Sequence, residues 1–366
     1  MGSFLTRGQS SALGLVRRAV ESERPPHALL LAGPPGVGKT TLALDLAAGL
    51  LCLADDPRDR PCRACAACHK IEHGNHPDLH IFRPEGAGQQ IRVGQVQALA
   101  AELALLPLEG RFRVAIIEAA QRLNVDAQNA LLKTLEEPPA RVVLILAADD
   151  SASLLPTVVS RCARARLGPV AIESIAQLIV ERGLSDAARA AAVARLAAGR
   201  PGVALALATR PESALVQARL AGALLDLLRA DRRRRLSAQA ELLADAAALG
   251  RTAVEGSEPD DLPRRTGRTA ARISPAERRA AAATLLAVWR DVARDLAVAT
   301  RGGQRELHQH ELLDELAAAG GAIDPAAASR FLERLEAVSR ALDAYANPEL
   351  AVDALLLAWP SWRSAA

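Results

Sequence analysis

The sequence is poor in aromatic residues, which make up 2% of its 366 positions. It has no apolar run near the roughly 18 residues that a membrane helix requires, and its N-terminus shows no signal-peptide pattern. Its charges nearly cancel, with 45 basic and 42 acidic residues. These absences argue against a membrane or secreted protein, a stacking platform for single-stranded nucleic acid, and a chain that holds nucleic acid by bulk charge. A cytoplasmic location is the default expectation.

Aliphatic residues take the place of the missing aromatics, since half of the sequence is hydrophobic. Such a composition favours helices packed by aliphatic side chains, and the length predicts two to three domains of about 150 residues each. The first 170 residues alternate short β-like runs with helical patterns, which is typical of an α/β domain with a parallel sheet. The expected strands are 27–32, 78–82, 112–117 and 142–146.

After Pro169 the β-like runs cease and the remaining sequence predicts helices only. The fold class is therefore α/β followed by all-α. We predict an α/β domain over 1–168, a small helical domain over 169–208 and a C-terminal helical domain over 209–366. Within the last of these, 251–275 is rich in Gly, Pro, Ser, Thr and charge, and it predicts a flexible loop or a disordered insertion.

The segment 33–40, GPPGVGKT, fits the P-loop pattern and stands directly between an apolar strand and a helical run. Its glycines let backbone N–H groups turn toward phosphate oxygens, and the following helix directs its positive end at them. Lys39 can reach the β- and γ-phosphates, and the Thr40 hydroxyl can ligate Mg²⁺. ATP or ADP with Mg²⁺ is the predicted ligand, and the predicted binding residues are Gly33, Gly36, Val37, Gly38, Lys39, Thr40, Thr41 and Glu118.

Hydrolysis needs more than a phosphate loop, because an acidic residue must hold Mg²⁺ and another group must position the attacking water. Glu118, at the end of a predicted strand, stands where a P-loop enzyme places its Mg²⁺-associated aspartate. The next residue, where many such enzymes carry a glutamate, is Ala119. Asp126, Asp149 and Asp150 are the nearest substitutes in sequence, and we interpret them first as helix-start and loop carboxylates. Nucleotide binding is predicted, and turnover is expected to be weak or absent.

A group of cysteines within 17 residues predicts a structural metal site formed by Cys52, Cys62, Cys65 and Cys68. Four thiolates match tetrahedral zinc with no position open for a catalytic water. Two less favoured interpretations are free buried thiols and a redox pair. A third alternative replaces one thiolate by one of the nearby histidines, which are His69, His73, His76 and His80.

Three further motifs occur beside the P loop: NALLKTLEEPP over 129–139, the triplet Ser160-Arg161-Cys162, and the four-cysteine segment. Together they resemble the AAA+ clamp-loader subunits of bacterial DNA polymerase III, strongly over residues 1–210. The resemblance implies an AAA+ domain, a helical lid over 169–208 and a helical collar over 209–366. It also implies a hetero-oligomeric ring with gamma/tau and delta subunits, which loads a sliding clamp onto primed DNA.

Two sibling families share these motifs, the ATP-hydrolysing gamma/tau type and the delta-prime type, and four departures favour the second. The acidic strand ends in Glu118-Ala119 instead of an Asp-Glu pair, and Ala148-Asp149 replaces the sensor-1 threonines. Gly202 stands where gamma/tau has a sensor-2 arginine, and the triplet at 76–78 resembles delta-prime. An ATPase motor of the gamma/tau type remains the first alternative, and a zinc-stabilised adaptor without enzymatic activity remains the second.

The resemblance also implies that Arg161 is an arginine finger, which would reach into a neighbouring subunit's ATP site. The competing interpretation is a surface arginine paired with a carboxylate. Glu136 and Glu137 are expected to end a helix that faces the neighbour. The run Arg232–Arg235 is expected to be a solvated helix face, with contact to DNA or to another subunit as its alternative.

Overall fold

The structure is a computed structural model, and it describes residues 2–84, 90–254, 274–303, 307, 312–344 and 346–362. The chain forms two compact units. Their residues are Met1–Ile175 with Gly199–Gly202 for unit 1, and Ala176–Ala198 with Val203–Ala366 for unit 2. Most of the predicted flexible loop 251–275 lies outside the described residues, and a boundary between a lid and a collar stays a prediction.

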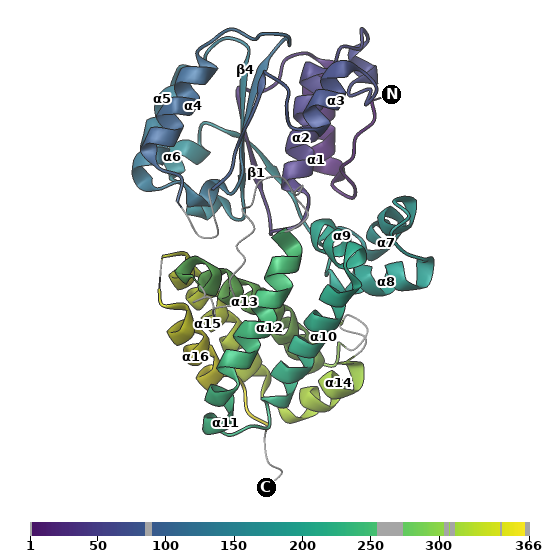
Figure 1. Ribbon diagram of the computed structural model, residues 1–366, viewed down its shortest axis with the longest axis vertical. Helices are drawn as coiled ribbons and strands as arrows, with labels where there is room; N and C mark the ends of the chain where they lie inside the picture. The colour runs from purple at the N-terminus through teal and green to yellow at the C-terminus, as the bar shows by residue number, and fades with distance from the viewer. Residues whose placement is uncertain are drawn as a thin grey trace, which may run out of the picture. The chain divides into compact units, whose positions relative to one another are not determined.

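Unit 1 is built on a five-stranded parallel sheet in the order β2-β3-β4-β1-β5. Figure 1 labels β1 and β4 of this sheet. The strands are β1 (Ala28–Ala32), β2 (Leu79–Phe82), β3 (Arg113–Ile117), β4 (Val142–Ala148) and β5 (Ala163–Arg166). The order places β1, which precedes the P loop, between β4 and β5. Loops that follow β1 and β4 therefore meet at one edge of the sheet.

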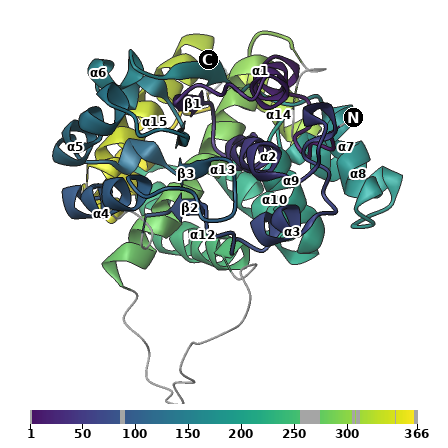
Figure 2. The ribbon, with the colours of Figure 1, turned by 90° about the horizontal axis from the view of Figure 1, so that it is seen from above.

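Helices cover both faces of this sheet (Figures 1 and 2). Alternation along β1 supplies both cores, because Leu29 and Leu31 join the core with α1 and α2 while Leu30 joins the opposite core with α4 and α5. The helices of this part are α1 (Ser10–Glu21), α2 (Lys39–Leu51), α3 (Ala66–Glu72), α4 (Val93–Leu103), α5 (Val125–Glu136) and α6 (Pro156–Val159), with short 3₁₀ turns η1 (Pro57–Asp59), η2 (Ala120–Arg122) and η3 (Ser151–Ser153).

The predicted α/β fold class of this part is confirmed, and all four predicted strands are present. Asn124 caps the start of α5, since its side chain accepts a hydrogen bond from the backbone N–H of Ala127 at 2.8 Å. The sequence analysis missed β5, whose Ala163-Arg164-Ala165-Arg166 sequence has no β-branched or aromatic residue. Pairing with β1 makes this segment a strand in spite of its composition.

All regular elements among the described residues of unit 2 are helices, which confirms the all-α prediction for the second half. Three of the few aromatic residues gather in its core, where Trp289, Phe331 and Trp359 have ring centroids 4.5–5.5 Å apart. The helices after Pro169 are α7 (Ile172–Glu181), α8 (Ala187–Leu196), α9 (Pro201–Thr209), α10 (Pro211–Asp226), α11 (Arg232–Ser237), α12 (Gln239–Val254), α13 (Pro275–Ala299), α14 (Leu313–Ala322), α15 (Pro325–Asp343) and α16 (Pro348–Ala358).

The arginine run on α11 was expected to be a solvated helix face. This expectation is wrong for one of its four residues. Arg235 is buried, and its guanidinium donates to the backbone oxygens of Leu227 at 3.0 Å and Pro360 at 2.9 Å. It therefore ties the end of the chain to the loop after α10, while the three arginines before it are exposed. No helix among the described residues is long and apolar enough to cross a membrane.

Candidate functional site

The P loop takes a conformation that only glycine adopts without strain at two of its positions. Gly36 and Gly38 have φ angles of 82° and 103°, in the left-handed region. Gly38 directly precedes α2, so the helix begins at Lys39 with its unpaired N–H groups at the loop. Between the two glycines, Val37 is buried and anchors the loop in the core with α1 and α2.

The remaining predicted loop residues lie at the same edge of the sheet. Gly33 follows β1, and its N–H donates to the backbone oxygen of Ala148 at the end of β4 at 3.2 Å. Thr40 and Thr41 occupy the first turn of α2 and are half-buried. The loop, the start of α2 and the ends of β1 and β4 thus lie together at one edge of the sheet, and phosphate binding there stays a prediction.

The Lys39 ammonium is engaged by three oxygens. It donates to the backbone oxygens of Gly33 at 2.5 Å and Pro34 at 3.0 Å. It also forms an ion pair with Asp149, with 2.7 Å between Nζ and Oδ1. Asp149 is one of the three substitute carboxylates considered from the sequence, and it directly follows β4.

The other two candidate carboxylates have local structural roles. Asp150 caps the 3₁₀ turn η3 by accepting the N–H of Ala152 at 3.0 Å, and Asp126 lies exposed in the first turn of α5. The interpretation as loop and helix-start carboxylates fits these two residues. Asp149 is a loop carboxylate too, but its partner is the P-loop lysine.

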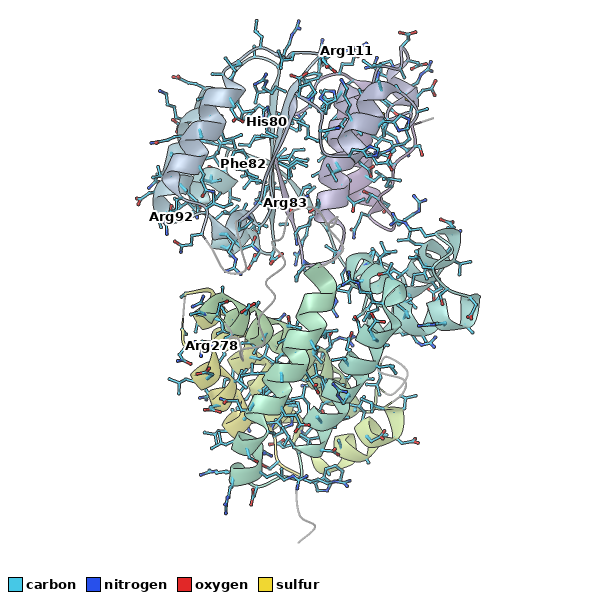
Figure 3. The ribbon with its side chains drawn as sticks, viewed as in Figure 1. His80, Phe82, Arg83, Arg92, Arg111 and Arg278 are labelled. Atoms are coloured by element: carbon cyan, nitrogen blue, oxygen red, sulfur yellow. The ribbon has the colours of Figure 1, made fainter. Side chains whose placement is uncertain are left out.

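Glu118 follows β3 at the same carboxyl edge of the sheet. One of its oxygens pairs with Arg83 at 3.0 Å. Arg83 follows directly after β2 (Figure 3). Its other oxygen, Oε1, is buried and has no hydrogen-bond partner among the described residues. Ala119 follows with φ at 51° and carries only a methyl group. This edge of the sheet therefore offers one carboxylate oxygen of Glu118 to a cation. Ala119 offers no base that could take a proton from a water.

Gly202, which the resemblance assigns to the sensor-2 position, lies against the P loop itself. Its backbone N–H donates to the Gly36 oxygen at 2.9 Å, and a Cβ at this position would stand 3.2 Å from the same oxygen. Any larger side chain here would press on the loop unless the loop moved. At this position the chain has a glycine instead of an arginine, and the backbone at the start of α9 contacts the P loop directly.

The four predicted cysteines come together. Their sulfur atoms all lie within 4.8 Å of one another, and Sγ of Cys52 is 3.9 Å from Sγ of Cys65. Four thiolates at the usual zinc–sulfur distance stand about 3.8 Å apart at the corners of a tetrahedron. The cluster can therefore hold a metal ion of this kind.

The electrostatics at Cys65 favour a ligand thiolate. Burial raises its pKa, but backbone N–H groups of Leu53 and Cys68 and the neighbouring thiols outweigh burial and lower it to about 6. None of the four nearby histidines belongs to the cluster within the described chain. His76 instead accepts the N–H of Asp78 at 3.1 Å through Nδ1, and burial lowers its pKa.

The cysteine segment is tied to the rest of unit 1 through Arg63, which stands between two of the ligand positions. Its guanidinium pairs with Asp45, a fully buried carboxylate on α2. Asp45 also accepts the backbone N–H groups of Leu5 at 3.0 Å and Thr6 at 2.8 Å. One buried charge thus joins the cysteine segment, α2 and the start of the chain.

Arg161 lies just after α6 with its side chain partly exposed. Its guanidinium donates to the Thr157 backbone oxygen at 3.0 Å and pairs with Glu136 at 2.7 Å. Glu136 ends α5, so this ion pair brings the segment 129–139 and the triplet 160–162 side by side. In the single chain Arg161 is therefore a surface arginine paired with a carboxylate. Cys162 beside it is buried, and burial raises its pKa to about 11.

Two glutamines that the sequence analysis did not single out also serve the site. Gln9 donates to the Gly168 oxygen at 2.7 Å and to the Val37 oxygen at 3.3 Å, which holds the P loop from the side of α1. Gln121 donates to Asp149 Oδ2 at 2.7 Å. Neither belongs to a recognisable pattern, and only the fold brings them to the loop.

Known proteins are similar to this chain over its N-terminal half, which holds the features described above. The family model described as DNA polymerase III, delta subunit, matches residues 8–171. DNA polymerase III subunit delta' of Bacillus subtilis is 36% identical over 177 residues, which are 48% of this chain and 53% of that protein. The Pseudomonas aeruginosa subunit delta' is 43% identical over 141 residues, 37% of this chain and 41% of that protein.

DNA polymerase III subunit tau of Salmonella typhimurium is 37% identical over 168 residues, 46% of this chain and 26% of that protein. The chain thus matches about half or less of the length of these curated relatives. The matches confirm the predicted resemblance of the N-terminal half to delta-prime clamp-loader subunits of bacterial DNA polymerase III, with gamma and tau as siblings.

Proposed function

We propose that this chain acts as the delta-prime subunit of a bacterial clamp loader. It binds nucleotide at its P loop, hydrolyses it weakly or not at all, and supplies Arg161 to the ATP site of a neighbouring subunit. Gamma/tau and delta subunits are its partners in the ring, and the sliding clamp and primed DNA are reached through that assembly. The cytoplasmic location expected from the sequence stays a prediction.

The observation that carries this function is the alanine beside Glu118 at an otherwise complete phosphate site. Lys39, the P-loop glycines and the start of α2 provide what phosphate binding needs. Ala119 cannot orient or deprotonate a water, and Asp149, the nearby carboxylate, is engaged by Lys39. The site is therefore suited to holding a nucleotide rather than turning it over.

Two groups fit this site and the cysteine cluster. Mg²⁺ would bind between the nucleotide, the Thr40 hydroxyl and Glu118, whose buried oxygen has no other partner among the described residues. Zinc would bind the four sulfurs and stabilise the segment without taking part in chemistry, because four thiolates close its coordination shell.

Arg161 has the properties that a trans-acting arginine requires. Its side chain is 37% exposed, and its cis partner Glu136 is 51% exposed, so the pair costs little to separate. A planar, permanently charged guanidinium can then bind oxygens of a γ-phosphate across a subunit boundary. In the single chain, the pair with Glu136 holds the arginine at the surface, where a neighbouring subunit can reach it.

The test uses the reconstituted complex with gamma/tau and delta subunits. Arg161→Ala is expected to lower DNA-dependent ATP turnover by about 10³-fold at the site that it serves, while the variant folds and assembles normally. Arg164→Ala is the matched control, because it removes an exposed arginine from the adjacent strand. Unchanged turnover with Arg161→Ala, or an equal loss with Arg164→Ala, would contradict the finger assignment.

The intact P loop favours one second candidate, an ATP-hydrolysing motor of the gamma/tau type. Purified chain incubated with ATP and Mg²⁺ distinguishes the two functions. Phosphate release at ordinary ATPase rates that is lost in Lys39→Ala would identify a motor, and release at background level would support the delta-prime function.

A further inference from the structure

The ammonium group of Lys39 has no donor to spare. It carries three N–H bonds, and its three partners are the oxygens of Gly33, Pro34 and Asp149. The side chain is only 10% exposed. A phosphate oxygen that binds Lys39 must therefore displace one of these partners, and one of them carries a full negative charge.

Asp149 is itself held in place. Its Oδ2 accepts from the side-chain amide of Gln121 at 2.7 Å, and its backbone N–H donates to the carbonyl oxygen of the same amide at 3.3 Å. Gln121 belongs to the turn after β3, and Asp149 directly follows β4. This reciprocal pair of hydrogen bonds aims the carboxylate at Lys39 from the edge of the sheet.

A carboxylate fixed in this way acts on phosphate groups by its charge. Each phosphate added to a nucleotide brings more negative charge to the loop, and like charges a few ångströms apart repel. Whether Asp149 stays on Lys39 or is displaced, its charge remains beside the site. The electrostatic repulsion from Asp149 therefore weakens the binding of a nucleoside triphosphate more than that of a diphosphate.

We propose that Asp149 is a specificity-determining residue that competes with the terminal phosphate for Lys39 and makes this P loop favour ADP over ATP. The proposal rests on the proposed function, because it requires that the loop binds nucleotide. It adds which nucleotide the subunit holds, and it assigns the choice to a residue outside the P loop.

The test is equilibrium binding of ATP and of ADP, each with Mg²⁺, to the full-length chain and its variants. Asp149→Asn keeps the shape of the side chain and removes its charge. It is expected to tighten ATP binding by about fivefold and ADP binding by less than about twofold. Asp150→Asn is the matched control, since it removes the same charge one residue away from a side chain that caps a turn.

The outcomes separate this proposal from the nucleotide site itself. Equal tightening for ATP and ADP in Asp149→Asn, or the same gain for ATP in Asp150→Asn, would overturn the preference and leave nucleotide binding intact. ATP binding that appears only in Asp149→Asn would support it. Failure of the wild-type chain and of Asp149→Asn to bind either nucleotide would contradict the phosphate site, and the preference with it.

Discussion

At the scale of single residues, Asp78 shows that a residue of a recognition motif can serve the fold. Its side chain is fully buried and accepts three backbone N–H groups, from Leu108 at 2.6 Å, Glu109 at 2.8 Å and Gly110 at 2.7 Å. The loop before β3 is therefore wrapped around one carboxylate. Although burial raises the pKa of Asp78, these hydrogen bonds outweigh burial and lower it.

We expect Asp78→Asn to reduce the free energy of unfolding of unit 1 by about 2 kcal/mol at neutral pH, because an amide replaces a charged acceptor. The lowered pKa makes this contribution complete above the usual aspartate value of about 4, and it is lost as the pH falls through the folded value. Urea unfolding of wild type and variant at pH 7, 5 and 3 measures it.

The difference in stability between wild type and Asp78→Asn should be the same at pH 7 and 5 and smaller at pH 3. A difference that stays constant down to pH 3 would contradict the role of the ionised carboxylate. Asp126→Asn is the control, since that aspartate is exposed on α5 and its removal should cost little.

At the scale of elements, we expect the cysteine segment 52–68 to depend on a bound metal ion for its order. It connects α2 with α3, and between these two helices the regular structure is limited to one 3₁₀ turn. A metal bound by four sulfurs would fix this segment and hold Arg63 on the buried Asp45. Without the metal the segment would loosen, and Asp45 would lose the cation that compensates its burial.

Metal removal is therefore expected to lower the thermal midpoint of unit 1 by about 5 °C or more. The purified chain should contain one zinc ion, measured by mass spectrometry under native conditions, and Cys65→Ser should lose it. Cys162→Ser is the matched control, because Cys162 is buried on the opposite face of the sheet and outside the cluster. A chain that carries no metal and does not respond to a chelator would disprove the site.

At the scale of the whole molecule, each compact unit has a core of its own. Unit 1 packs two aliphatic layers on its sheet, and unit 2 packs its helices around the aromatic group of Trp289, Phe331 and Trp359. The chain has three tryptophans, and all three lie in unit 2. Tryptophan fluorescence therefore reports the unfolding of unit 2 alone.

We expect Phe331→Ala to destabilise unit 2 by about 3 kcal/mol. The substitution removes a ring that contacts Trp289 and Trp359, and it leaves a large cavity in its place. The fluorescence transition in urea should move to a lower concentration. Leu31→Ala, a comparable core deletion in β1, should move the far-ultraviolet circular dichroism transition of unit 1 and leave the fluorescence midpoint in place. An equal shift of that midpoint by Leu31→Ala would show that the two units unfold together.

Local patterns predicted most of the elements and the residue types at each site. Strands rich in leucine, isoleucine and valine, the Asn124 cap and the P loop are encoded within a few residues, and all are present in the structure. The strand β5 was missed because its stability comes from pairing with β1 rather than from its own sequence. The burial of Arg235 was missed for the same reason, since its acceptors lie outside α11.

The sequence by itself determined the α/β and all-α halves, the phosphate loop and the cysteine set, because each is specified by spacing along a short segment. Only the tertiary structure decided which distant residues complete the site. The strand order places β4 beside β1, which brings Asp149 to Lys39 across 110 positions of the chain. Such contacts depend on how strands are ordered in a sheet, and no local pattern records that order. The few aromatic residues give a second example. Nothing in the local sequence indicates that three of them come together in one core, and only the folded chain shows it.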